Sequence, residues 1–237
     1  MGRKTIVVSG GTRGIGKAIV QKFYSEGFVT AVCARSSTDL SRLKEELISG
    51  SEDQRFLGFE CDMADRAQID RFAMEVKNNV ENVDVLVNNA GIFLPGQIST
   101  EEEGTFEKLW QVNVGGAYHL TRALLPLIRP KKNAHIFNMC STASITAYVN
   151  GGSYCITKHA LLGMNRVLRE ELKQDGIKVT AILPGATLTD SWRGTELPED
   201  RFIPAQDIAE IVWNCYNTDA STVVEELLVR PQLGDIT

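Results

Sequence analysis

Short apolar segments rich in β-branched residues alternate with helical segments along this chain, about seven times. The first of them, Thr5-Ile6-Val7-Val8-Ser9, leads through a turn into a helical stretch over residues 17–25. Continuous apolar runs of this length are typical of strands that are buried on both faces of a parallel sheet. Because parallel neighbours need a crossover connection, the alternation predicts an α/β fold, a doubly wound parallel sheet of about seven strands with helices on both faces.

The expected elements follow one another without a linker, a repeat or a break in composition, so we expect one domain spanning residues 1–237. The expected strands cover residues 5–9, 28–33, 55–60, 83–87, 135–140, 177–183 and 222–229. The expected helices cover residues 17–25, 40–49, 68–79, 106–127, 154–174 and 205–216. Gly176 should end the 154–174 helix.

Composition excludes several classes of function. The formal net charge of −5 argues against a general nucleic-acid binder, which would present a basic face. The five cysteines are odd in number and form no C-x-x-C pair, which suits reduced thiols in a cytosolic protein. The three histidines show no metal-ligand spacing, so we expect no metal site. No apolar run approaches the ~20 residues that cross a bilayer, and the chain enters its first strand without a signal peptide. We expect a cytoplasmic protein with neither nucleic acid nor membrane as a partner.

A glycine-rich turn, Gly10-x-x-x-Gly14-x-Gly16, stands between the first strand and the first helix. Its glycines let the backbone turn tightly and approach a pyrophosphate, while the helix N-terminus supplies N–H donors and the positive end of the helix dipole. The spacing differs from the common dinucleotide spacing G-x-G-x-x-G, and a plain turn is the alternative. The order of strand, glycine turn and helix favours a dinucleotide phosphate site.

The second expected strand ends in Ala34-Arg35-Ser36, where an NAD site usually places an acid against the ribose 2′-hydroxyl. The first acid is Asp39, which we expect to lie in the next helix. Arg35 stands where a 2′-phosphate would lie, and Arg13 offers a second guanidinium from the glycine turn. We therefore infer NADP(H) rather than NAD(H). The alternative is that Arg35 is a solvated residue at a strand end.

Two later strand ends carry small or polar residues. Asp62, in Cys61-Asp62-Met63, could accept a hydrogen bond from an adenine amino group or could cap the helix that begins near Asp65, and the sequence leaves both open. Asn88-Asn89-Ala90-Gly91 follows the fourth strand. Small and amide residues at this position suit the ligand crevice of an open α/β sheet.

The helix expected over residues 106–127 carries Asn113 and the pair Gly115-Gly116. Two glycines inside a helix cost about 1 kcal/mol each, so we expect close packing or a local distortion beside Asn113. Before this helix, Ser99 or Thr100 precedes the acids Glu101-Glu102-Glu103. That pattern predicts a capped and solvated N-terminus of the same helix.

Tyr154 and Lys158 are four residues apart in the helix expected over residues 154–174. Residues at this spacing share one helix face, so the ammonium can approach the phenol, favour the phenolate and lower its pKa. A tyrosine tuned in this way can exchange a proton near neutral pH. Ser141 follows the strand at 135–140. Taken alone, a surface pair on a helix is the alternative for Tyr154 and Lys158.

The glycine turn, Asn88-Asn89-Ala90-Gly91, Asn113, Ser141, the Tyr154-x-x-x-Lys158 motif and Pro184-Gly185 together resemble the short-chain dehydrogenase/reductase family, in its compact single-domain branch. The resemblance covers essentially the whole chain, and the motifs stand in the family's order and spacing. It implies a Rossmann fold similar to that of 3-oxoacyl-carrier-protein reductases and small carbonyl reductases.

The chain departs from the family pattern in a few places. Ser9 stands where threonine is most frequent, and Thr187 stands where valine or isoleucine is frequent. The expected substrate loop, at about residues 188–204, is short and has few apolar residues apart from Leu188, Trp192 and Leu197. The substrate therefore stays open.

The resemblance implies an NADP(H)-dependent oxidoreductase that transfers hydride between the nicotinamide and a carbonyl or secondary alcohol. Tyr154 would be the general acid in reduction and the general base in oxidation, with Lys158 lowering its pKa and binding the nicotinamide ribose. Ser141 would donate a hydrogen bond to the substrate oxygen, Asn113 would hold a water that links Lys158 to solvent, and Thr189 would bind the nicotinamide carboxamide. The expected cofactor contacts are Gly10, Thr12, Arg13, Gly14, Ile15, Gly16, Arg35, Ser36, Asp62, Met63, Asn89, Ala90, Gly91, Tyr154, Lys158, Pro184, Gly185, Thr187 and Thr189.

Two other functions fit the same motifs. One is an NAD-dependent alcohol dehydrogenase of the same family, and the other is a non-catalytic NADP(H)-binding sensor. A nucleotide-sugar epimerase or dehydratase would need a larger C-terminal region than this chain offers. In this family the helices expected at 106–127 and 154–174 and the last strand form subunit contacts, so the resemblance also implies a homodimer or homotetramer.

Overall fold

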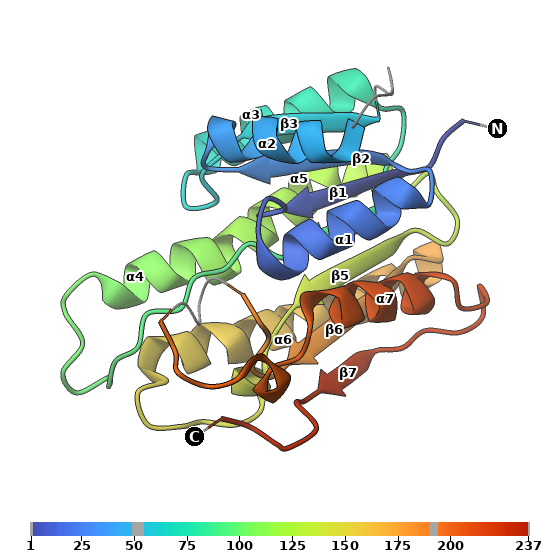
Figure 1. Ribbon diagram of the computed structural model, residues 1–237. Helices are drawn as coiled ribbons and strands as arrows, with labels where there is room; N and C mark the ends of the chain where they lie inside the picture. The colour runs from blue at the N-terminus through green and yellow to red at the C-terminus, as the bar shows by residue number, and fades with distance from the viewer. Residues whose placement is uncertain (1, 49–54, 190–193, 237) are drawn as a thin grey trace.

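The computed structural model describes residues 2–48, 55–189 and 194–236 (Figure 1). One sheet of seven strands runs through it in the order β3-β2-β1-β4-β5-β6-β7, and every neighbouring pair is parallel. The predicted doubly wound parallel sheet is therefore confirmed. The strands are β1 (Thr5–Ser9), β2 (Val29–Ala34), β3 (Phe56–Glu60), β4 (Val85–Asn88), β5 (His135–Met139), β6 (Lys178–Pro184) and β7 (Glu226–Val229).

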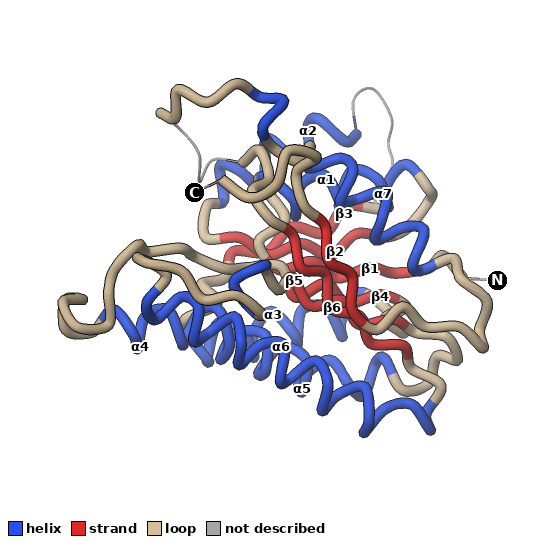
Figure 2. The backbone as a smooth tube through the Cα atoms, turned by 90° about the horizontal axis from the view of Figure 1, so that it is seen from below, coloured by secondary structure: helices blue, strands red, loops and turns tan. Residues whose placement is uncertain are grey.

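Helices cover both faces of this sheet, with α1, α2 and α7 on one side and α3, α4, α5 and α6 on the other (Figure 2). The helices are α1 (Gly14–Ser25), α2 (Ser37–Ile48), α3 (Arg66–Asn79), α4 (Thr105–Trp110), the π-helical η1 (Gln111–Gly116), α5 (Ala117–Ile128), α6 (Gly152–Leu172) and α7 (Ala205–Tyr216). Short 3₁₀ turns add η2 (Thr142–Ser144), η3 (Lys173–Asp175) and η5 (Glu199–Arg201). The predicted end of α2 at residue 49 lies outside the described residues.

The five inner strands are almost wholly buried because their side chains are largely apolar on both faces, while the edge strands β3 and β7 are partly exposed. All five residues of β1 and all seven of β6 are buried. On the α1–α7 face, Phe23 of α1 is fully buried and meets the rings of Phe28 and Trp213 edge to face, with centroids 5.1 and 5.2 Å apart. Such aromatic pairs contribute beyond the area that they bury. These contacts fix α1, which follows the glycine turn, against the sheet.

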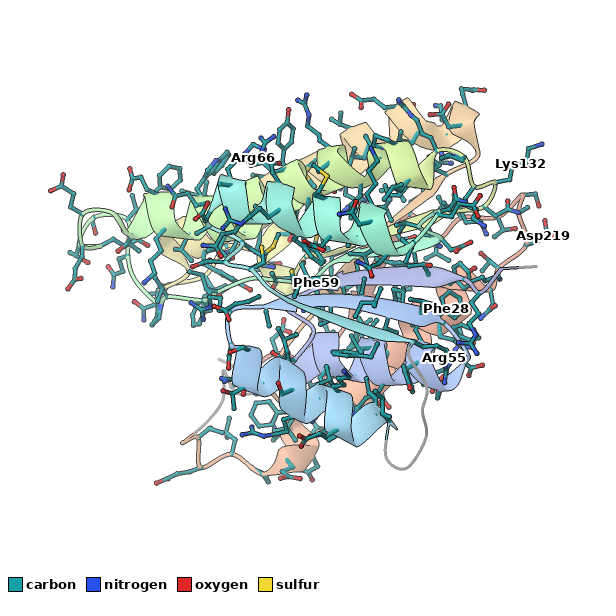
Figure 3. The ribbon with its side chains drawn as sticks, turned by 90° about the horizontal axis from the view of Figure 1, so that it is seen from above. Phe28, Arg55, Phe59, Arg66, Lys132 and Asp219 are labelled. Carbon is teal, nitrogen blue, oxygen red and sulfur yellow. The ribbon has the colours of Figure 1, made fainter. Side chains whose placement is uncertain are left out.

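The order of the strands reverses between β1 and β4, because the chain crosses from β1 to β2 and β3 on one side and continues from β4 to β5 on the other. Loops that leave the carboxyl ends of β1 and β4 therefore diverge, and ligand crevices of open α/β sheets form at such a point. Lys132 and Asp219, in loops at the opposite edge of the sheet, mark the far end of the molecule in Figure 3. The topology thus places the candidate site between the loops after β1 and β4.

The helix predicted over residues 106–127 is broken into three parts, since η1 is a π-helical turn between α4 and α5. Asn113, Gly115 and Gly116 all lie in η1. A Cβ atom on Gly116 would lie only 2.8 Å from the Met63 carbonyl oxygen. The glycine pair therefore accompanies both the distortion and the close packing that the sequence predicted.

The prediction of a capped start for this helix is wrong. The residue that precedes α4 is Gly104, which has a left-handed φ of 86° and no side chain to cap with. Glu101 instead accepts hydrogen bonds from Ser153 at the start of α6. Glu101 and its partner Ser153 are 52 positions apart, so the local sequence pattern indicated the wrong helix. Elsewhere Gly176, with φ 73°, ends the α6–η3 stretch as predicted.

Candidate active site

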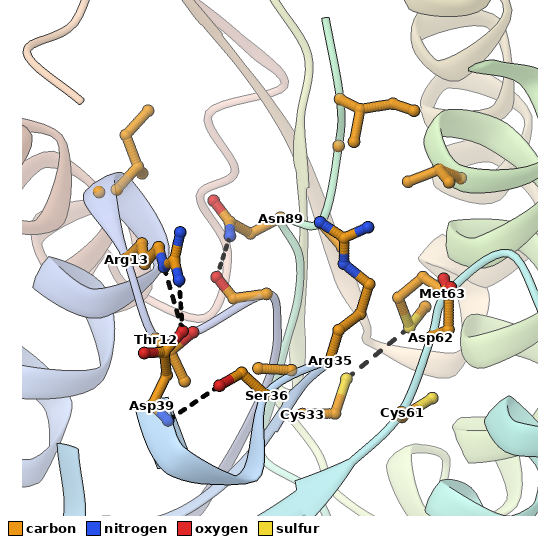
Figure 4. A pocket seen from close by; sticks show the side chains of 18 of the residues that line it. Thr12, Arg13, Cys33, Arg35, Ser36, Asp39, Cys61, Asp62, Met63 and Asn89 are labelled. Atoms are coloured by element: carbon orange, nitrogen blue, oxygen red, sulfur yellow. Dashed lines mark hydrogen bonds and ion pairs between the residues drawn. The ribbon is translucent and has the colours of Figure 1, made fainter. Parts of the chain in front are cut away.

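A cavity of about 360 Å³ opens at the carboxyl edge of the sheet, between the loops that follow β1 and β4 (Figure 4). The predicted cofactor contacts that line it are Gly10, Thr12, Arg13, Gly14, Ile15, Arg35, Ser36, Asp62, Met63, Asn89, Ala90, Gly91 and Thr189. The lining also includes residues that the sequence reasoning did not select, which are Cys33, Ala34, Asp39, Cys61, Ile92 and Val112. The expected contacts that do not line it are Gly16, Tyr154, Lys158, Pro184, Gly185 and Thr187.

The glycine turn adopts backbone conformations that favour glycine. Gly10 has φ 66° and Gly14 has φ 49°, both in the left-handed region. Gly16 is required for another reason, because a Cβ atom there would lie 2.3 Å from the Gly10 carbonyl oxygen and 2.4 Å from Asn89 Nδ2. The absent side chain lets the start of α1 approach the loop after β4, and the N-terminus of α1 faces the cavity.

Hydrogen bonds tie the loops after β1 and β4 together. Asn89 Nδ2 donates to the carbonyl oxygens of Ser9 and Gly10 at 3.0 and 2.9 Å. The Ser9 hydroxyl oxygen accepts from the backbone N–H groups of Asn89 and Ala90, both at 3.1 Å. Both bonds are accepted by the hydroxyl oxygen, which serine and threonine share, so serine can replace the more frequent threonine at position 9. The predicted contact Asn89 therefore also builds the cavity wall.

The two arginines predicted to hold a 2′-phosphate differ in their surroundings. Arg35 is exposed, lines the cavity, and forms no ion pair within the described part of the chain (Figure 4). Arg13 also lines the cavity, but its Nη2 lies 2.6 Å from Asp39 Oδ2. The hydrogen bond to Arg13 lowers the pKa of Asp39. Asp39 does lie in α2 as predicted, yet it reaches the cavity, which the sequence reasoning did not anticipate.

The structure separates the two possibilities left open for Asp62. Asp65 caps α3, since its carboxylate accepts from the N–H groups of Ala67 and Gln68. Among the described residues, the Asp62 carboxylate accepts one local bond, at Oδ1 from the N–H of Ala64 at 2.9 Å, and Asp62 lines the cavity. The capping alternative is therefore excluded for Asp62, and its place in the cavity wall leaves it available to a ligand.

Asn113 is buried, and its side chain is hydrogen-bonded to protein atoms. Its Oδ1 accepts from the N–H of Ile92 at 2.8 Å, and its Nδ2 donates to the Ile92 carbonyl at 3.0 Å and to Thr157 Oγ1 at 3.1 Å. The amide thus joins the π-helical turn to the loop after β4 and to α6. This anchoring was not predicted. Because Oδ1 accepts one bond from the described residues and can accept a second, the expected water-holding role stays a prediction.

Lys158 and Tyr154 lie on one face of α6, but they do not interact as predicted. The buried Lys158 ammonium donates to the Met139 carbonyl at 2.8 Å and lies 5.7 Å from the centroid of the Tyr154 ring. Burial raises the pKa of Tyr154 to about 12, and a hydrogen bond with Ser141 opposes this rise. Burial also lowers the pKa of Lys158. The predicted low pKa of Tyr154 is wrong for this structure, because desolvation of the phenol outweighs the effect of its neighbours.

Ser141 lies two residues after the end of β5, beside Tyr154. Its Oγ accepts from the N–H of Ala143 at 3.1 Å, while Ser144 Oγ accepts from the N–H of Ser141, which forms a capping box on η2. Since Oγ already accepts this bond, its own proton remains available for donation. The short turn η2 therefore fixes Ser141 with its hydroxyl next to Tyr154.

The predicted residues after β6 divide into two groups. Thr189 lies over the glycine turn, since a Cβ on Gly14 would be 2.8 Å from Thr189 Cγ2. Gly185 donates from its N–H to the Val229 carbonyl at 2.8 Å, and the buried Thr187 donates to the Gly185 carbonyl at 3.1 Å. Pro184 is the last residue of β6. Of these four residues only Thr189 reaches the cavity wall.

Two aromatic side chains, Phe93 and Tyr148, lie near Tyr154. The ring of Phe93 meets the Tyr154 ring edge to face, with centroids 4.9 Å apart. Tyr148 lies near Tyr154, and burial raises the pKa of Tyr148 to about 12. Of the three apolar residues predicted for the substrate loop, Leu188 and Leu197 are partly exposed. Trp192 lies outside the described residues.

The chain belongs to the short chain dehydrogenase family, whose model matches residues 4–200. The resemblance inferred from the motifs is thereby confirmed. A sepiapterin reductase from Chlorobaculum tepidum is 29% identical over 98% of this chain and 97% of the relative. The 3-oxoacyl-[acyl-carrier-protein] reductase FabG from Haemophilus influenzae is 29% identical over 93% of each chain. An alcohol dehydrogenase from the archaeon Thermococcus sibiricus, complexed with 5-hydroxy-NADP, superposes with a TM-score of 0.89 at 26% identity and full coverage of both chains.

The described residues form neither a metal site nor a membrane-spanning helix. In residues 2–48, 55–189 and 194–236, no three His, Cys, Asp or Glu side chains gather closely enough to hold a metal ion. Over the same ranges, no helix is long and apolar enough to cross a membrane. Because the chain belongs to the short chain dehydrogenase family, it is a member of a family of oxidoreductases.

Proposed function

We propose that this protein is an NADP(H)-dependent oxidoreductase that transfers hydride between the nicotinamide and a carbonyl or secondary alcohol, such as a 3-oxoacyl thioester or a small ketone. The observation that carries the proposal is the meeting of three groups beside the cavity. Ser141 lies close enough to Tyr154 to lower the pKa of the phenol, and Lys158 Nζ would lie 3.6 Å from a Cβ on Gly91 in the cavity wall. A phenol, a hydroxyl and an ammonium thus lie near one another, and the ammonium lies beside the Gly91 part of the cavity wall.

The residues of the cavity fit a dinucleotide. The glycine turn leaves room that a Cβ atom would fill, and the N-terminus of α1 offers N–H donors and a positive dipole to a pyrophosphate. Arg35 presents an exposed guanidinium, which suits a 2′-phosphate better than a ribose hydroxyl. The bound nicotinamide would supply or accept the hydride. The 5-hydroxy-NADP in the Thermococcus sibiricus structure supports the same cofactor class.

Tyr154 is suited to the role of general acid. With a pKa of about 12, its phenol carries a proton at neutral pH and can give it to a substrate oxygen during reduction. Ser141 would donate a hydrogen bond to the same oxygen and so stabilise the charge that develops there. In oxidation Tyr154 would accept the proton, and the neighbouring Ser141, which lowers the pKa of the phenol, favours that deprotonated form.

The surroundings of Tyr154 favour an apolar substrate. Phe93 and Tyr148 present aromatic rings beside it, and Leu188 lies on the segment that follows β6. A carbonyl compound with an apolar or aromatic body would bury surface against these side chains. We therefore expect 3-oxoacyl thioesters, diketones and other ketones to be better substrates than sugars, and an activity screen should test them first.

A second candidate is an NAD-dependent alcohol dehydrogenase. Asp39 lines the cavity, and an acid near this strand end commonly binds the ribose 2′-hydroxyl of NAD. Its ion pair with Arg13 argues for the first candidate, because the carboxylate is already engaged. Titration with NADPH and NADH separates the two.

The test of the proposal is the variant Tyr154→Phe. We expect it to abolish turnover on the carbonyl that the wild-type protein reduces best, while NADPH binding, measured by fluorescence titration, stays nearly unchanged. Tyr118→Phe is the control, because Tyr118 lies on α5 and does not line the cavity, and it should behave as the wild type. Near wild-type turnover in Tyr154→Phe would refute the assignment. A wild-type protein that binds NADPH but reduces no carbonyl would support a non-catalytic sensor instead.

We also propose that residues 1–237 act as one domain and that the protein is a homodimer or homotetramer. Large apolar side chains are exposed along the layer formed by α4, α5 and α6, namely Phe106, Trp110, Tyr118, Ile156 and Val167. Burying such a face between subunits would remove it from water. Light scattering that shows a monomer at micromolar concentration would contradict the oligomer.

A further inference from the structure

The loop from Gly91 to Gly104, which leads from β4 to α4, folds against the start of α6 (Figure 1). The N–H of Gly96 donates to the Asn150 carbonyl at 3.0 Å, and Gly96 forms a β-bridge with Gly151. These contacts bring the loop to the residues that immediately precede Tyr154.

Glu101 forms two hydrogen bonds that join this loop to α6. Its Oε1 accepts from the Ser153 N–H at 2.8 Å, and its Oε2 accepts from the Ser153 hydroxyl. The Ser153 N–H lies in the first turn of α6, where backbone donors have no partner within the helix. A carboxylate at this end also interacts favourably with the helix dipole. Glu101 therefore caps α6 from a distant part of the chain.

Two glycines make room for this carboxylate. A Cβ on Gly152 would lie 2.0 Å from Glu101 Oε1, and a Cβ on Gly96 would lie 2.8 Å from Glu101 Cγ. Any larger residue at either position would displace the glutamate. The close fit on both sides indicates that the carboxylate occupies a site shaped for it rather than a solvated surface position.

The same loop also contacts the side chain of Tyr154. Phe93 lies on it, and the Phe93 ring packs edge to face on the Tyr154 ring. Glu101 bonds Ser153, the residue directly before Tyr154, so the loop holds Tyr154 through its backbone on one side and through its ring on the other. A shift of Glu101 would be transmitted to both contacts.

We propose that Glu101 is a positioning residue for Tyr154, and this rests on the function proposed above. By capping α6 and holding the loop against it, the carboxylate keeps the phenol aligned with Ser141 and with the substrate oxygen. Misplacement of a reacting group by about 1 Å can reduce turnover about 100-fold. Binding of the cofactor should not depend on Glu101, because this residue does not line the cavity.

The test compares Glu101→Gln with Glu102→Gln. Glutamine keeps the length of the side chain but removes the charge and one acceptor. Glu102 is the matched control, since it is the adjacent residue on the same loop and is exposed. We expect Glu101→Gln to lower kcat about 10- to 100-fold with little change in KM for NADPH or in NADPH affinity. Glu102→Gln should match the wild type in every measurement.

Amide hydrogen exchange supplies a readout that needs no substrate. In Glu101→Gln, peptides covering residues 150–160 should exchange faster, whereas those covering α1 should not change. Unchanged exchange at 150–160, or a kcat within about twofold of the wild type, would overturn the proposal. A wild-type protein with no turnover on any carbonyl would refute the proposed function, and the exchange comparison would still decide whether Glu101 holds the start of α6.

Discussion

Replacing Gly16 by alanine tests whether the close approach of α1 to the loop after β4 builds the cofactor cavity. The added Cβ would lie 2.3 Å from the Gly10 carbonyl oxygen and 2.4 Å from Asn89 Nδ2. Those two atoms are hydrogen-bonded to each other at 2.9 Å, so the methyl group has to push the loops apart. The variant therefore disturbs the wall of the cavity without adding charge or polarity.

The expected cost follows from three contributions. Overpacking a rigid site costs about 1–3 kcal/mol. Weakening the two hydrogen bonds that Asn89 Nδ2 donates costs about 0.5–1.5 kcal/mol each. Alanine gains about 1 kcal/mol over glycine within a helix, which offsets part of this. The net loss is about 1–5 kcal/mol, and each 1 kcal/mol lowers Tm by about 2–4 °C for a chain of this length.

Gly163→Ala is the matched control. This glycine lies within α6, and a Cβ there would have nothing within 4 Å. The same substitution should therefore stabilise the fold by about 1 kcal/mol and raise Tm by about 2–4 °C. Thermal unfolding followed by circular dichroism measures both shifts, which should have opposite signs. In fluorescence titrations Gly16→Ala should bind NADPH more weakly and Gly163→Ala should not. A Gly16→Ala protein with wild-type Tm and wild-type affinity would refute the reasoning.

Three further predictions concern the cofactor, acid stability and the core. Arg35→Asp should reduce the preference for NADPH over NADH about tenfold or more, because a charge-assisted bond to the 2′-phosphate is lost and a repulsion is added. Lys44→Asp on the exposed side of α2 is its control, and an unchanged ratio of kcat/KM values in Arg35→Asp would contradict the NADP(H) assignment. Burial lowers the pKa of His135 to about 3, so between about pH 6.5 and pH 3 the unfolded chain binds a proton that the folded chain does not. The free energy of unfolding should thus fall as the pH falls, with about 2 kcal/mol lost through His135 between about pH 7.5 and pH 5. Urea unfolding at both pH values should show a loss that is smaller by about this amount in His135→Phe than in the wild type. Phe23→Ala should cost about 3–5 kcal/mol in the same measurement, since its fully buried ring contacts Phe28 and Trp213, and a loss below about 1 kcal/mol would show that the site repacks.

Local sequence patterns were sufficient to predict the sheet and most of its helices. The β-branched run of β1 and the apolar run of β6 predicted strands buried on both faces, and both are. Gly115 and Gly116 predicted a disturbed helix, and the π-helical turn contains both. Each of these signals depends on neighbours within a few residues, which is the range over which propensity and periodicity act.

Contacts between distant residues were not accessible in this way. Nothing near Glu101 in the sequence indicates that its partner is Ser153, and the local pattern pointed to the wrong helix. Asp39 was excluded from the cavity because it belongs to α2, yet its side chain reaches back to Arg13. The spacing of Tyr154 and Lys158 predicted a shared helix face correctly, but the ammonium is bonded to Met139, and burial sets the direction of the phenol's pKa. Such features depend on the three-dimensional packing of elements.

The π-helical turn at Gln111–Gly116 makes the position of Asn113 depend on the length of this part of the chain. A π turn holds one residue more than an α turn. Because the π turn accommodates the extra residue within one wider turn, deleting one residue would restore a regular helix and leave α4 and α5 facing nearly as before. Leu109 would stay in the core, but the turn that directs Asn113 toward Ile92 and Thr157 would be lost. A single-residue deletion here should therefore remove the Asn113 anchor while the helices on either side remain packed.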